Sequence, residues 1–396
     1  MIADKYTIRE QNEAMVLSNI INHSEISRSA VSQNTGLNKA SISEIVKKFI
    51  NDKLINEIGI GSSSVSGGRK PILLQLNKKA GVSLGIDIGY DYVASMLTYL
   101  NGEIVKEKSS TGVLVTKENV ISIIKDIIDS YTDLASNFPY QIIGITLAVH
   151  GIVFEKKIVF TPYYDLDKLD LLEELSKITT IPIYMENEAN LTSLAENTFS
   201  TKKSNLISVS IHSGIGAGII MNGSLYCGRH GRSGEIGHMI LHPHGLSCPC
   251  GNQGCFEQYC SEKAILNQFR LIKNDFSLNL DDLVNEYRNN DTQTVSLIKD
   301  LIDHLSIGIN NLIATYGPEI IYINSSLTRK IPEILLAVKN NMVSSFNKNT
   351  PLFESQLGAK ATLLGASSLA IKNFLRVENL DFQLNSGAIY KLQSSK

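Results

Sequence analysis

Two segments of the chain, about 120 residues apart, repeat one pattern of apolar runs and turns. Residues 82–108 are VSLGIDIGYDYVASMLTYLNGEIVKEK, and residues 205–228 are NLISVSIHSGIGAGIIMNGSLYCG. Each segment predicts a strand, a tight glycine turn, a second strand and an Asn-Gly turn into a third strand, at Asn101-Gly102 and Asn222-Gly223. The repeat therefore predicts an internally duplicated α/β body with a cleft between two lobes.

The segments around these repeats predict helices and buried strands. Residues 118–134 and 170–178 have the apolar spacing of amphipathic helices. Such helices alternate with runs that look like buried strands ending in polar loops, where α/β proteins bind their ligands. The glycine-rich segment 213–218, SGIGAG, fits either a phosphate-binding loop or a tight hairpin turn, and the sequence leaves both open. The three strand-like runs are residues 141–153, 181–190 and 319–327.

A basic segment, residues 1–79, precedes this body. It carries 11 Lys and Arg against 7 Asp and Glu, whereas the whole chain has a net charge of −2. Met15, Val16 and Ile20 have the spacing of a first helix. Ser27 is a suitable cap for a second helix that ends at Gly36, and Asn38 for a third. Apolar residues recur at helical spacing in the third helix, at Ile42, Ile45, Val46, Phe49 and Ile50.

The second and third helices predict a helix-turn-helix. Two apolar segments, 55–60 and 72–76, flank a Ser/Gly-rich tip that ends in Arg69-Lys70, which is typical of a β-hairpin wing. The start of the third helix is small and basic, so it suits a DNA major groove about 12 Å wide. We predict a winged helix-turn-helix, and a three-helix adaptor with a solvated basic face is the alternative. The residues expected to contact DNA are Arg28, Lys39, Ala40, Ser41, Ser43, Lys47, Lys48 and Arg69.

Four of the five cysteines lie within residues 248–260. His238, Cys248, Cys250 and Cys255 have short loop spacings that suit tetrahedral zinc, and four protein ligands would make the ion structural. Pro249, Gly251 and Gly254 allow the sharp bends that such a loop needs. His242 or His244 can replace His238 in this scheme, and metal-free thiols are a further alternative. Cys227 and Cys260 are expected to be small buried side chains.

Polar side chains surround this loop. Glu235 and Glu257 flank it, and Asn187-Glu188 offers a second pair of polar groups. Fixed carboxylates and an amide suit the hydroxyl groups of a sugar. The alternative is that these are surface or helix-capping residues. Taken one at a time, each of the four residues favours this alternative.

Length and composition limit the classes of protein to which the chain can belong. The chain has 396 residues, with 43% hydrophobic and 19% charged side chains, which is enough for two or three domains with cores. It contains no apolar run of the roughly 20 residues that span a bilayer. Its N-terminus lacks the apolar segment of a signal peptide. We expect a cytoplasmic protein, in which clustered cysteines more often hold metal than form disulfides.

The sequence resembles the ROK family of sugar kinases and transcriptional repressors. The resemblance rests on residues 234–261 around the cysteines, ENEANLTSLAE at 186–196, GIDIG at 85–89 and LGASSLAI at 364–371. The N-terminal winged helix is similar to that of the repressor branch. Within that branch, the DIGYDY and HGIV segments resemble those of the xylose repressors of Gram-positive bacteria.

The resemblance implies a winged helix-turn-helix at residues 1–79 and a two-lobed, actin-like body at 80–396. Lobe one would cover about 80–197 plus the C-terminal end, and lobe two about 198–373 with the zinc loop at 238–255. The family pattern implies structural zinc on His238, Cys248, Cys250 and Cys255. It implies sugar contacts from His150, Gly151, Asn187, Glu188, Glu235, His238 and Glu257.

The chain departs from the kinases of this family at two places. Where the kinases carry an Asp that acts as general base, this chain has Glu188, and a misplacement of about 1 Å can cost on the order of 100-fold. Tyr90 and Asp91 follow Gly89, where a bulky ring and a negative charge would oppose a triphosphate. We therefore predict that the chain is not an enzyme and that the glycines of SGIGAG are a structural relic.

His150 is a third departure, because kinase relatives have Pro or a small residue there. One hypothesis is that its ring fills the space of a hexose C6 group and so favours a pentose. The alternative is that His150 points into the core.

Together these features predict a repressor that binds an inverted-repeat operator in double-stranded DNA as a dimer or dimer of dimers. A sugar effector, most simply xylose, would release it. A sugar kinase with an added DNA-binding head, or a repressor that responds to another sugar or to a protein partner, are the alternatives.

Overall fold

The computed structural model describes residues 5–60, 70–161 and 164–382, and the chain divides into two compact units. Unit 1 comprises Met1–Val149, Tyr164–Glu186 and Ala366–Lys396, and unit 2 comprises His150–Tyr163 and Asn187–Gly365. The domain limits expected from sequence, at residues 79, about 197 and about 373, stay predictions. None of the described helices has both the length and the apolar character that crossing a membrane requires.

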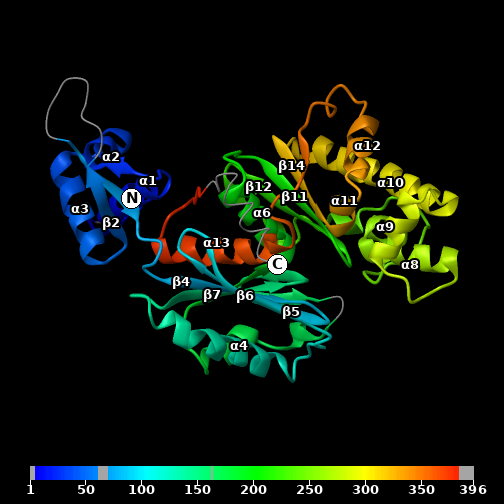
Figure 1. The fold of residues 1–396 in the computed structure, drawn as a ribbon, viewed down its shortest axis with the longest axis horizontal. Helices are drawn as coiled ribbons and strands as arrows, with labels where there is room; N and C mark the ends of the chain where they lie inside the picture. Colours follow the sequence, from blue (N-terminus) through cyan, green and yellow to red (C-terminus); the bar gives the residue numbers. More distant parts are fainter. Residues whose placement is uncertain (1–4, 61–69, 162–163, 383–396) are drawn as a thin grey trace. The chain divides into compact units, whose positions relative to one another are not determined.

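The first part of unit 1 is a three-helix head with a small sheet (Figure 1, dark blue). The Ser27 side chain accepts a hydrogen bond from the N–H of Ala30, and Gly36 ends that helix at a left-handed φ of 72°. The Asn38 side chain accepts from the N–H of Ser41 at 2.9 Å. These contacts confirm the predicted caps. The elements are α1 Lys5–Ile21, β1 Ile26–Ser27, α2 Arg28–Thr35, α3 Lys39–Asn51, β2 Ile55–Ile60 and β3 Ile72–Leu76, with strand order β1-β3-β2.

The head shares its hydrophobic core with the rest of unit 1. Val16 and Ile20 on α1 are fully buried, whereas Met15 is 45% exposed and lies off the apolar face. The same apolar cluster continues into Ile143, Ile371 and Leu375. Burial of each such side chain contributes about 1.5–3 kcal/mol. The head is therefore packed onto unit 1 and is not a module with a separate core.

A five-stranded sheet forms the remainder of unit 1, in the order β10-β7-β4-β5-β6. β4 pairs antiparallel with β5 and parallel with β7, and all seven residues of β4 are buried. Helix α4 covers one face of this sheet, and the later part of α13 covers the other (Figure 1). The elements are β4 Val82–Ile88, β5 Tyr92–Tyr99, β6 Ile104–Thr111, α4 Val120–Ala135, β7 Ile142–Val149, the 3₁₀ helix Leu166–Lys168, α5 Leu171–Ser176, β10 Ile183–Asn187 and α13 Ala361–Leu375.

Unit 2 repeats this sheet. Its strand order is β13-β12-β11-β14-β15, with β11 antiparallel to β12 and parallel to β14. The pattern matches β6-β5-β4-β7-β10 strand for strand, so the predicted duplication is confirmed. The strands are β11 Leu206–Ile211, β12 Ile215–Met221, β13 Ser224–Leu225, β14 Ile320–Ser325 and β15 Leu352–Glu354, and a separate hairpin comprises β8 Ile152–Phe154 and β9 Lys157–Phe160.

The helices of unit 2 pack around a large apolar core that includes Phe256 and Phe269. α10 is the longest of the described helices, and Gly308 on it leaves room for the Phe256 ring, because a Cβ there would lie 2.4 Å from the ring. The helices are α6 Glu188–Phe199, α7 Glu257–Cys260, α8 Glu262–Lys273, α9 Leu280–Arg288, α10 Thr292–Tyr316, α11 Ser326–Lys330 and α12 Glu333–Asn341, with 3₁₀ turns at Arg229–Gly231, Ile236–His238 and Gly358–Lys360.

Candidate functional site

One histidine and three cysteines converge in the loop between β13 and α7. The ligand atoms of His238, Cys248, Cys250 and Cys255 all lie within 4.8 Å of one another. The sulfurs of Cys250 and Cys255 are 3.7 Å apart, and His238 Nδ1 is 3.6 Å from Cys248 Sγ. Tetrahedral zinc, with bonds of about 2.3 Å to sulfur and about 2.0–2.1 Å to nitrogen, separates its ligands by about 3.5–3.8 Å. The four side chains therefore have the chemistry and the spacing for such an ion.

Glycines shape this loop. Gly251 and Gly254 have left-handed φ values of 95° and 80°. A Cβ on Gly254 would lie 1.6 Å from the carbonyl oxygen of His242, so no other residue fits there without a shift of the backbone. The bends that were predicted at these positions are present.

The two neighbouring histidines lie outside the cluster. His242 Nε2 is 2.9 Å from His304 Nε2 on α10, and its ring packs edge-on against Tyr259. His244 occupies a turn with a φ of 60°. The structure therefore brings His238, and neither His242 nor His244, to the thiols. Burial, followed by the proximity of His242, lowers the pKa of His304.

The remaining cysteines are not part of the cluster. Cys260 is 1% exposed, and burial raises the pKa of its thiol well above the usual value. A thiol in that environment is an inert apolar side chain. Cys227 is half-buried and lies outside the group of ligand atoms.

A cavity of about 110 Å³ lies next to the cluster, and every residue that lines it belongs to unit 2. The His238 ring stands between the two. Its Nδ1 atom faces Cys248, while its Nε2 atom lies 3.7 Å from Glu235 Oε2. The Nδ1 atom is also 3.7 Å from Glu257 Oε1, so one edge of the imidazole faces Cys248 and Glu257 and the other faces Glu235. The predicted residues that line it are His150, Gly151, Asn187, Glu188, Glu235, His238 and Glu257.

Asn187 and Glu188 reach the cavity from the junction of β10 and α6. The Asn187 side chain caps α6 by accepting from the N–H of Asn190, and its Nδ2 donates to the carbonyl of Gly151 at 2.8 Å. Capping, the alternative considered from sequence, is therefore one of its roles. Both contacts fix the amide, so its orientation at the cavity is set by the fold.

The Glu188 carboxylate is buried and held by hydroxyl groups. Its Oε1 atom accepts from Ser210 at 3.0 Å and from Thr192 and Thr362 at 3.3 Å each. These donors lie on β11, α6 and α13. The carboxylate is consequently anchored at one oxygen, which fixes its position at the cavity wall.

Glu235 and Glu257 form the acidic wall beside His238. Burial raises the pKa of Glu235, His238 opposes this shift and Glu257 adds to it. Glu257 Oε1 accepts from Gln258 Nε2 and from the Cys248 thiol, each at 3.3 Å. Gly214 and Gly237 make room for its other oxygen, because a Cβ on either would lie 3.1–3.2 Å from Oε2.

An apolar wall completes the cavity, and it was missed in the sequence. Phe160, at the end of β9, is 39% exposed and lines the cavity with Ile152 and Ile215. A Cβ on Gly151 would lie 2.2 Å from the Phe160 carbonyl oxygen, so only glycine allows the β8–β9 hairpin to pack this closely. The sequence signal that could have identified Phe160 is its position as an aromatic residue at the end of a short strand. His150 also lines the cavity, and its role in choosing a pentose stays a prediction.

The glycines of SGIGAG have a packing role. A Cβ on Gly218 would lie 2.2 Å from the carbonyl oxygen of Ala189, and one on Gly216 would lie 3.1 Å from the Ala189 side chain. The glycines therefore allow α6 to approach β12 closely. Of the two alternatives, the hairpin turn is the one present, with the N–H of His212 bonded to the carbonyl of Gly214 at 2.9 Å.

The turn after β4 in unit 1 is filled by an aromatic ring. Tyr92 lies 2.1 Å from where a Cβ on Gly89 would be, and its hydroxyl donates to Asp87 Oδ2 at 3.0 Å. Tyr90 and Asp91, the residues predicted to oppose a triphosphate, are both exposed. Tyr92 was not part of the sequence prediction; its ring packs against Gly89 and its hydroxyl occupies one oxygen of the Asp87 carboxylate.

The predicted DNA contacts divide into two groups. Lys39, Ala40, Ser43 and Lys47 are exposed on α3, and Ser41 is half-buried at its start. Arg28 is paired with Glu57 at 2.6 Å, and Lys48 is paired with Glu13 on α1. Arg69 lies outside the described residues. Among the predicted contacts that the structure describes, the exposed ones without an ion pair thus lie in the first turns of α3.

Comparison with known proteins agrees with this architecture. The ROK family model matches residues 83–373. The chain is also 37% identical to a xylose repressor of Bacillus subtilis over 385 residues, covering 94% of this chain and 98% of the repressor. The chain belongs to the ROK family. The family has both regulators and kinases among its solved structures, so its name alone does not give the activity.

Two solved ROK structures match the fold. A ROK family transcriptional regulator, a homologue of the Escherichia coli MLC protein, has a TM-score of 0.79 at 27% identity and covers 93% of this chain and 98% of its own. A ROK glucokinase from Streptomyces griseus, solved with glucose and AMPPNP, has a TM-score of 0.63 at 23% identity and covers 73% of this chain and 99% of its own. The fold class is confirmed: a winged helix-turn-helix precedes a sugar-kinase-like, actin-like body.

Proposed function

We propose that this ROK protein is a sugar-responsive transcriptional repressor and that xylose is its effector. The observation that carries the proposal is the joint presence of an exposed helix-turn-helix and a carboxylate-lined cavity in one chain. The similarity to the Bacillus subtilis xylose repressor spans almost the full length of both proteins and supports this assignment. The regulators among its relatives support a DNA operator as the partner of the head.

The cluster of His238, Cys248, Cys250 and Cys255 would hold a structural zinc ion. Bound zinc would cross-link the loop and occupy Nδ1 of His238. The Nε2 atom would then carry the proton and donate it in a hydrogen bond on the cavity side. In this arrangement the metal cluster sets the tautomer and the orientation of a sugar-binding imidazole.

The cavity suits a small sugar because its walls differ in polarity. Glu235 and Glu257 accept hydrogen bonds from sugar hydroxyls, and Asn187 and Glu188 add further polar groups. Phe160 and Ile152 offer an apolar surface to the C–H face of the ring. His150 lies beside Gly151 at the cavity wall, where its ring restricts the space for a C6 hydroxymethyl group. This favours a pentose over a hexose.

The head would bind DNA through the first turns of α3. A homodimer would place two heads on the half-sites of an inverted repeat, since a two-fold axis in the protein matches a palindrome in DNA. Lys39, Ser41 and Ser43 would reach base edges, and Lys47 would reach a phosphate. Arg69 is proposed as a wing contact from the sequence alone.

The kinase alternative has less support. Glu188 stands where the kinases of the family carry a shorter Asp, and the Tyr92 hydroxyl donates to Asp87 Oδ2. The two regulators reported above cover 93–94% of this chain, and the glucokinase similarity concerns the fold. We infer that the chain regulates transcription and does not phosphorylate the sugar.

One experiment tests the proposal. Operator DNA is selected from a random library with the purified protein, and its affinity is measured by fluorescence anisotropy with xylose, glucose or no sugar. Xylose should weaken operator binding by about 5- to 150-fold. Selection of no preferred DNA sequence, or an affinity that no sugar changes, would contradict the proposal. Release of ADP in the presence of ATP and xylose would favour the kinase instead.

A further inference from the structure

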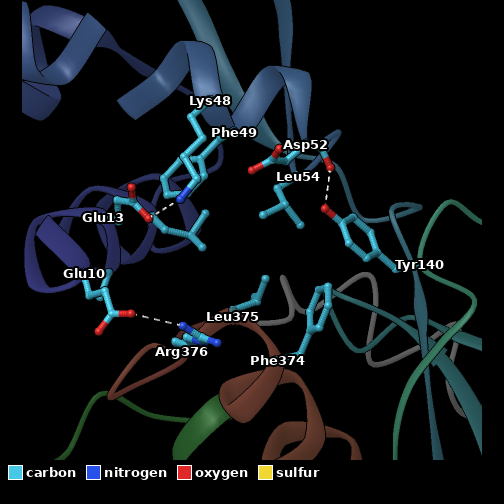
Figure 2. Close-up of a pocket in the computed structure, with 12 residues that line it drawn as sticks. Glu10, Glu13, Lys48, Phe49, Asp52, Leu54, Tyr140, Phe374, Leu375 and Arg376 are labelled. Carbon is cyan, nitrogen blue, oxygen red and sulfur yellow. Dashed lines mark hydrogen bonds and ion pairs between the residues drawn. The ribbon is translucent and has the colours of Figure 1, made fainter. Parts of the chain in front are cut away.

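The head contacts the last turn of α13 at a junction within unit 1, defined here by Tyr140, Asp52, Phe374 and Leu375 (Figure 2). The Tyr140 hydroxyl donates to the backbone carbonyl of Asp52 at 2.8 Å. Asp52 is the C-cap residue of α3, the helix with the predicted DNA contacts. The Tyr140 ring also packs edge-on against Phe374, with ring centroids 5.1 Å apart. One side chain thus touches both α3 and the end of α13.

Apolar packing holds the junction more than its ion pairs do. Leu17 on α1, Phe49 on α3 and Leu375 on α13 are 3–4% exposed and belong to one continuous cluster. Arg376 and Glu10 form an ion pair at 3.5 Å, but their side chains are 80% and 68% exposed. Exposed pairs of this kind contribute little. The energy of the junction therefore resides in buried apolar contacts and in the Tyr140 hydrogen bond.

The junction is not fully packed. A hollow of about 340 Å³ lies between the head and the end of α13, with Ala14 and Leu54 among its lining residues (Figure 2). The hollow is a groove open to solvent, because the exposed side chains of Glu10 and Arg376 are among its lining residues. Across the open part of this groove the head and the end of α13 make no direct contacts, so a small shift there breaks fewer contacts than one in a close-packed core.

The other end of α13 touches the proposed sugar site. Thr362, in the first turn, donates to Oε1 of Glu188 at 3.3 Å. Gly365 lies against α6, since a Cβ there would be 1.8 Å from the carbonyl oxygen of Leu191. α13 begins in unit 2 and ends in unit 1. The same helix therefore bonds a cavity carboxylate with its first turn and packs on the DNA-reading head with its last.

We propose that α13 carries the effector signal and that the Tyr140–Asp52–Phe374 junction is the surface on which the head receives it. This inference rests on the proposed sugar-responsive function. A sugar hydroxyl that binds Glu188 competes with Thr362 for the same carboxylate and so changes the position of α13. The junction converts that change into a different placement of α3.

The test uses the full-length protein and one quantity, the response ratio, which is the operator Kd with xylose divided by the Kd without it. Tyr140→Phe removes the bond to Asp52 and keeps the ring, and Ala14→Leu fills part of the hollow. Tyr140→Phe should change the response ratio by about 3-fold or more, the effect expected of one hydrogen bond. Ala14→Leu should change it by a similar factor, because burial of one added methylene group contributes about 0.8 kcal/mol. Their xylose affinity by calorimetry should stay within about 2-fold of wild type, since neither residue lines the cavity.

Tyr99→Phe is the matched control, because Tyr99 also packs edge-on against a phenylalanine, Phe138, in unit 1. It should leave the ratio unchanged. In a double-mutant cycle, Tyr140→Phe should have no further effect on the ratio once Thr362→Val has removed the donor to Glu188. Thermal melting of each variant checks that it is folded.

Two results overturn the proposal in different ways. An unchanged ratio in both Tyr140→Phe and Ala14→Leu, or additive effects in the cycle, would show that the signal does not pass through this junction, while the repressor function stands. A wild-type protein with a ratio of one for xylose would overturn the proposed function itself, and the junction inference with it.

Discussion

The Nδ1 atom of His238 lies 3.6 Å from the sulfur of Cys248, and the Nε2 atom of the same ring lies 3.7 Å from the Glu235 carboxylate at the cavity. A ligand of the cysteine cluster is thereby also a wall of the proposed sugar site. This arrangement makes metal content, sugar affinity and loop stability depend on one another, and it leads to the first two predictions.

Loss of one cysteine of the cluster should remove the metal and destabilise the protein. Cys250→Ser removes one of four ligands, so the zinc content should fall from about one ion per chain toward zero, and the melting temperature should fall with it. Elemental analysis and a thermal melt measure both. Cys227→Ser is the control, since Cys227 lies outside the cluster, and it should retain its metal. A Cys250→Ser protein with full metal content would show that the cluster is not the site.

Glu257→Gln should weaken xylose binding by about 10- to 100-fold, because a hydrogen bond to a charged acceptor contributes about 1.5–3 kcal/mol. Isothermal titration calorimetry measures the affinity. Glu286→Gln, a half-buried acid on α9 that pairs with Lys273 and does not line the cavity, should leave it unchanged. If Glu257→Gln binds xylose as tightly as wild type, the acidic wall does not contact the sugar.

His150→Ala should reduce the discrimination between xylose and glucose. Removal of the ring leaves space at the cavity wall for a hydroxymethyl group, so glucose affinity should rise relative to xylose affinity by roughly 10-fold. The two affinities are measured by the same calorimetry. An unchanged ratio of affinities would refute the role of His150 in selecting a pentose.

Lys47→Ala should weaken operator binding for all DNA sequences alike and reduce the slope of log K against log salt by about one unit, because one phosphate contact is lost. Anisotropy titrations between low and moderate salt give the slope. Lys48→Ala should change the slope less, since Lys48 is already paired with Glu13. Equal effects of the two variants would place both lysines at the DNA.

Glu196 should make stability depend on pH. Burial raises its pKa to about 7, with Ser200 and Ser355 opposing the shift. Its contribution to stability is therefore full below the unfolded pKa near 4.5 and is lost as the pH rises through about 7. Between pH 5.5 and 8.5, the free energy of unfolding of wild type should fall by about 2 kcal/mol relative to Glu196→Gln. Urea unfolding at both pH values measures this, and parallel curves would contradict it.

Local sequence was sufficient for the parts of the fold that depend on near neighbours. Ser27, Gly36 and Asn38 mark helix ends because a cap bonds to backbone within a few residues. The duplicated sheet followed from two similar patterns of apolar runs and Asn-Gly turns. The spacing of the cysteines indicated a metal loop because short loops bring their side chains together.

Long-range packing settled the remaining questions. His238 joins the thiols and His242 turns to His304, although sequence spacing allows either, because α10 supplies the partner from 62 residues away. Gly216 and Gly218 are needed because α6 packs closely against their strand. Lys48 is engaged in an ion pair because Glu13 on α1 lies beside it. Phe160 lines the cavity because the β8–β9 hairpin packs closely against Gly151. In each case the deciding contact joins residues from separate elements, and the energy of such contacts depends on distances in space that no pattern of neighbours along the chain encodes.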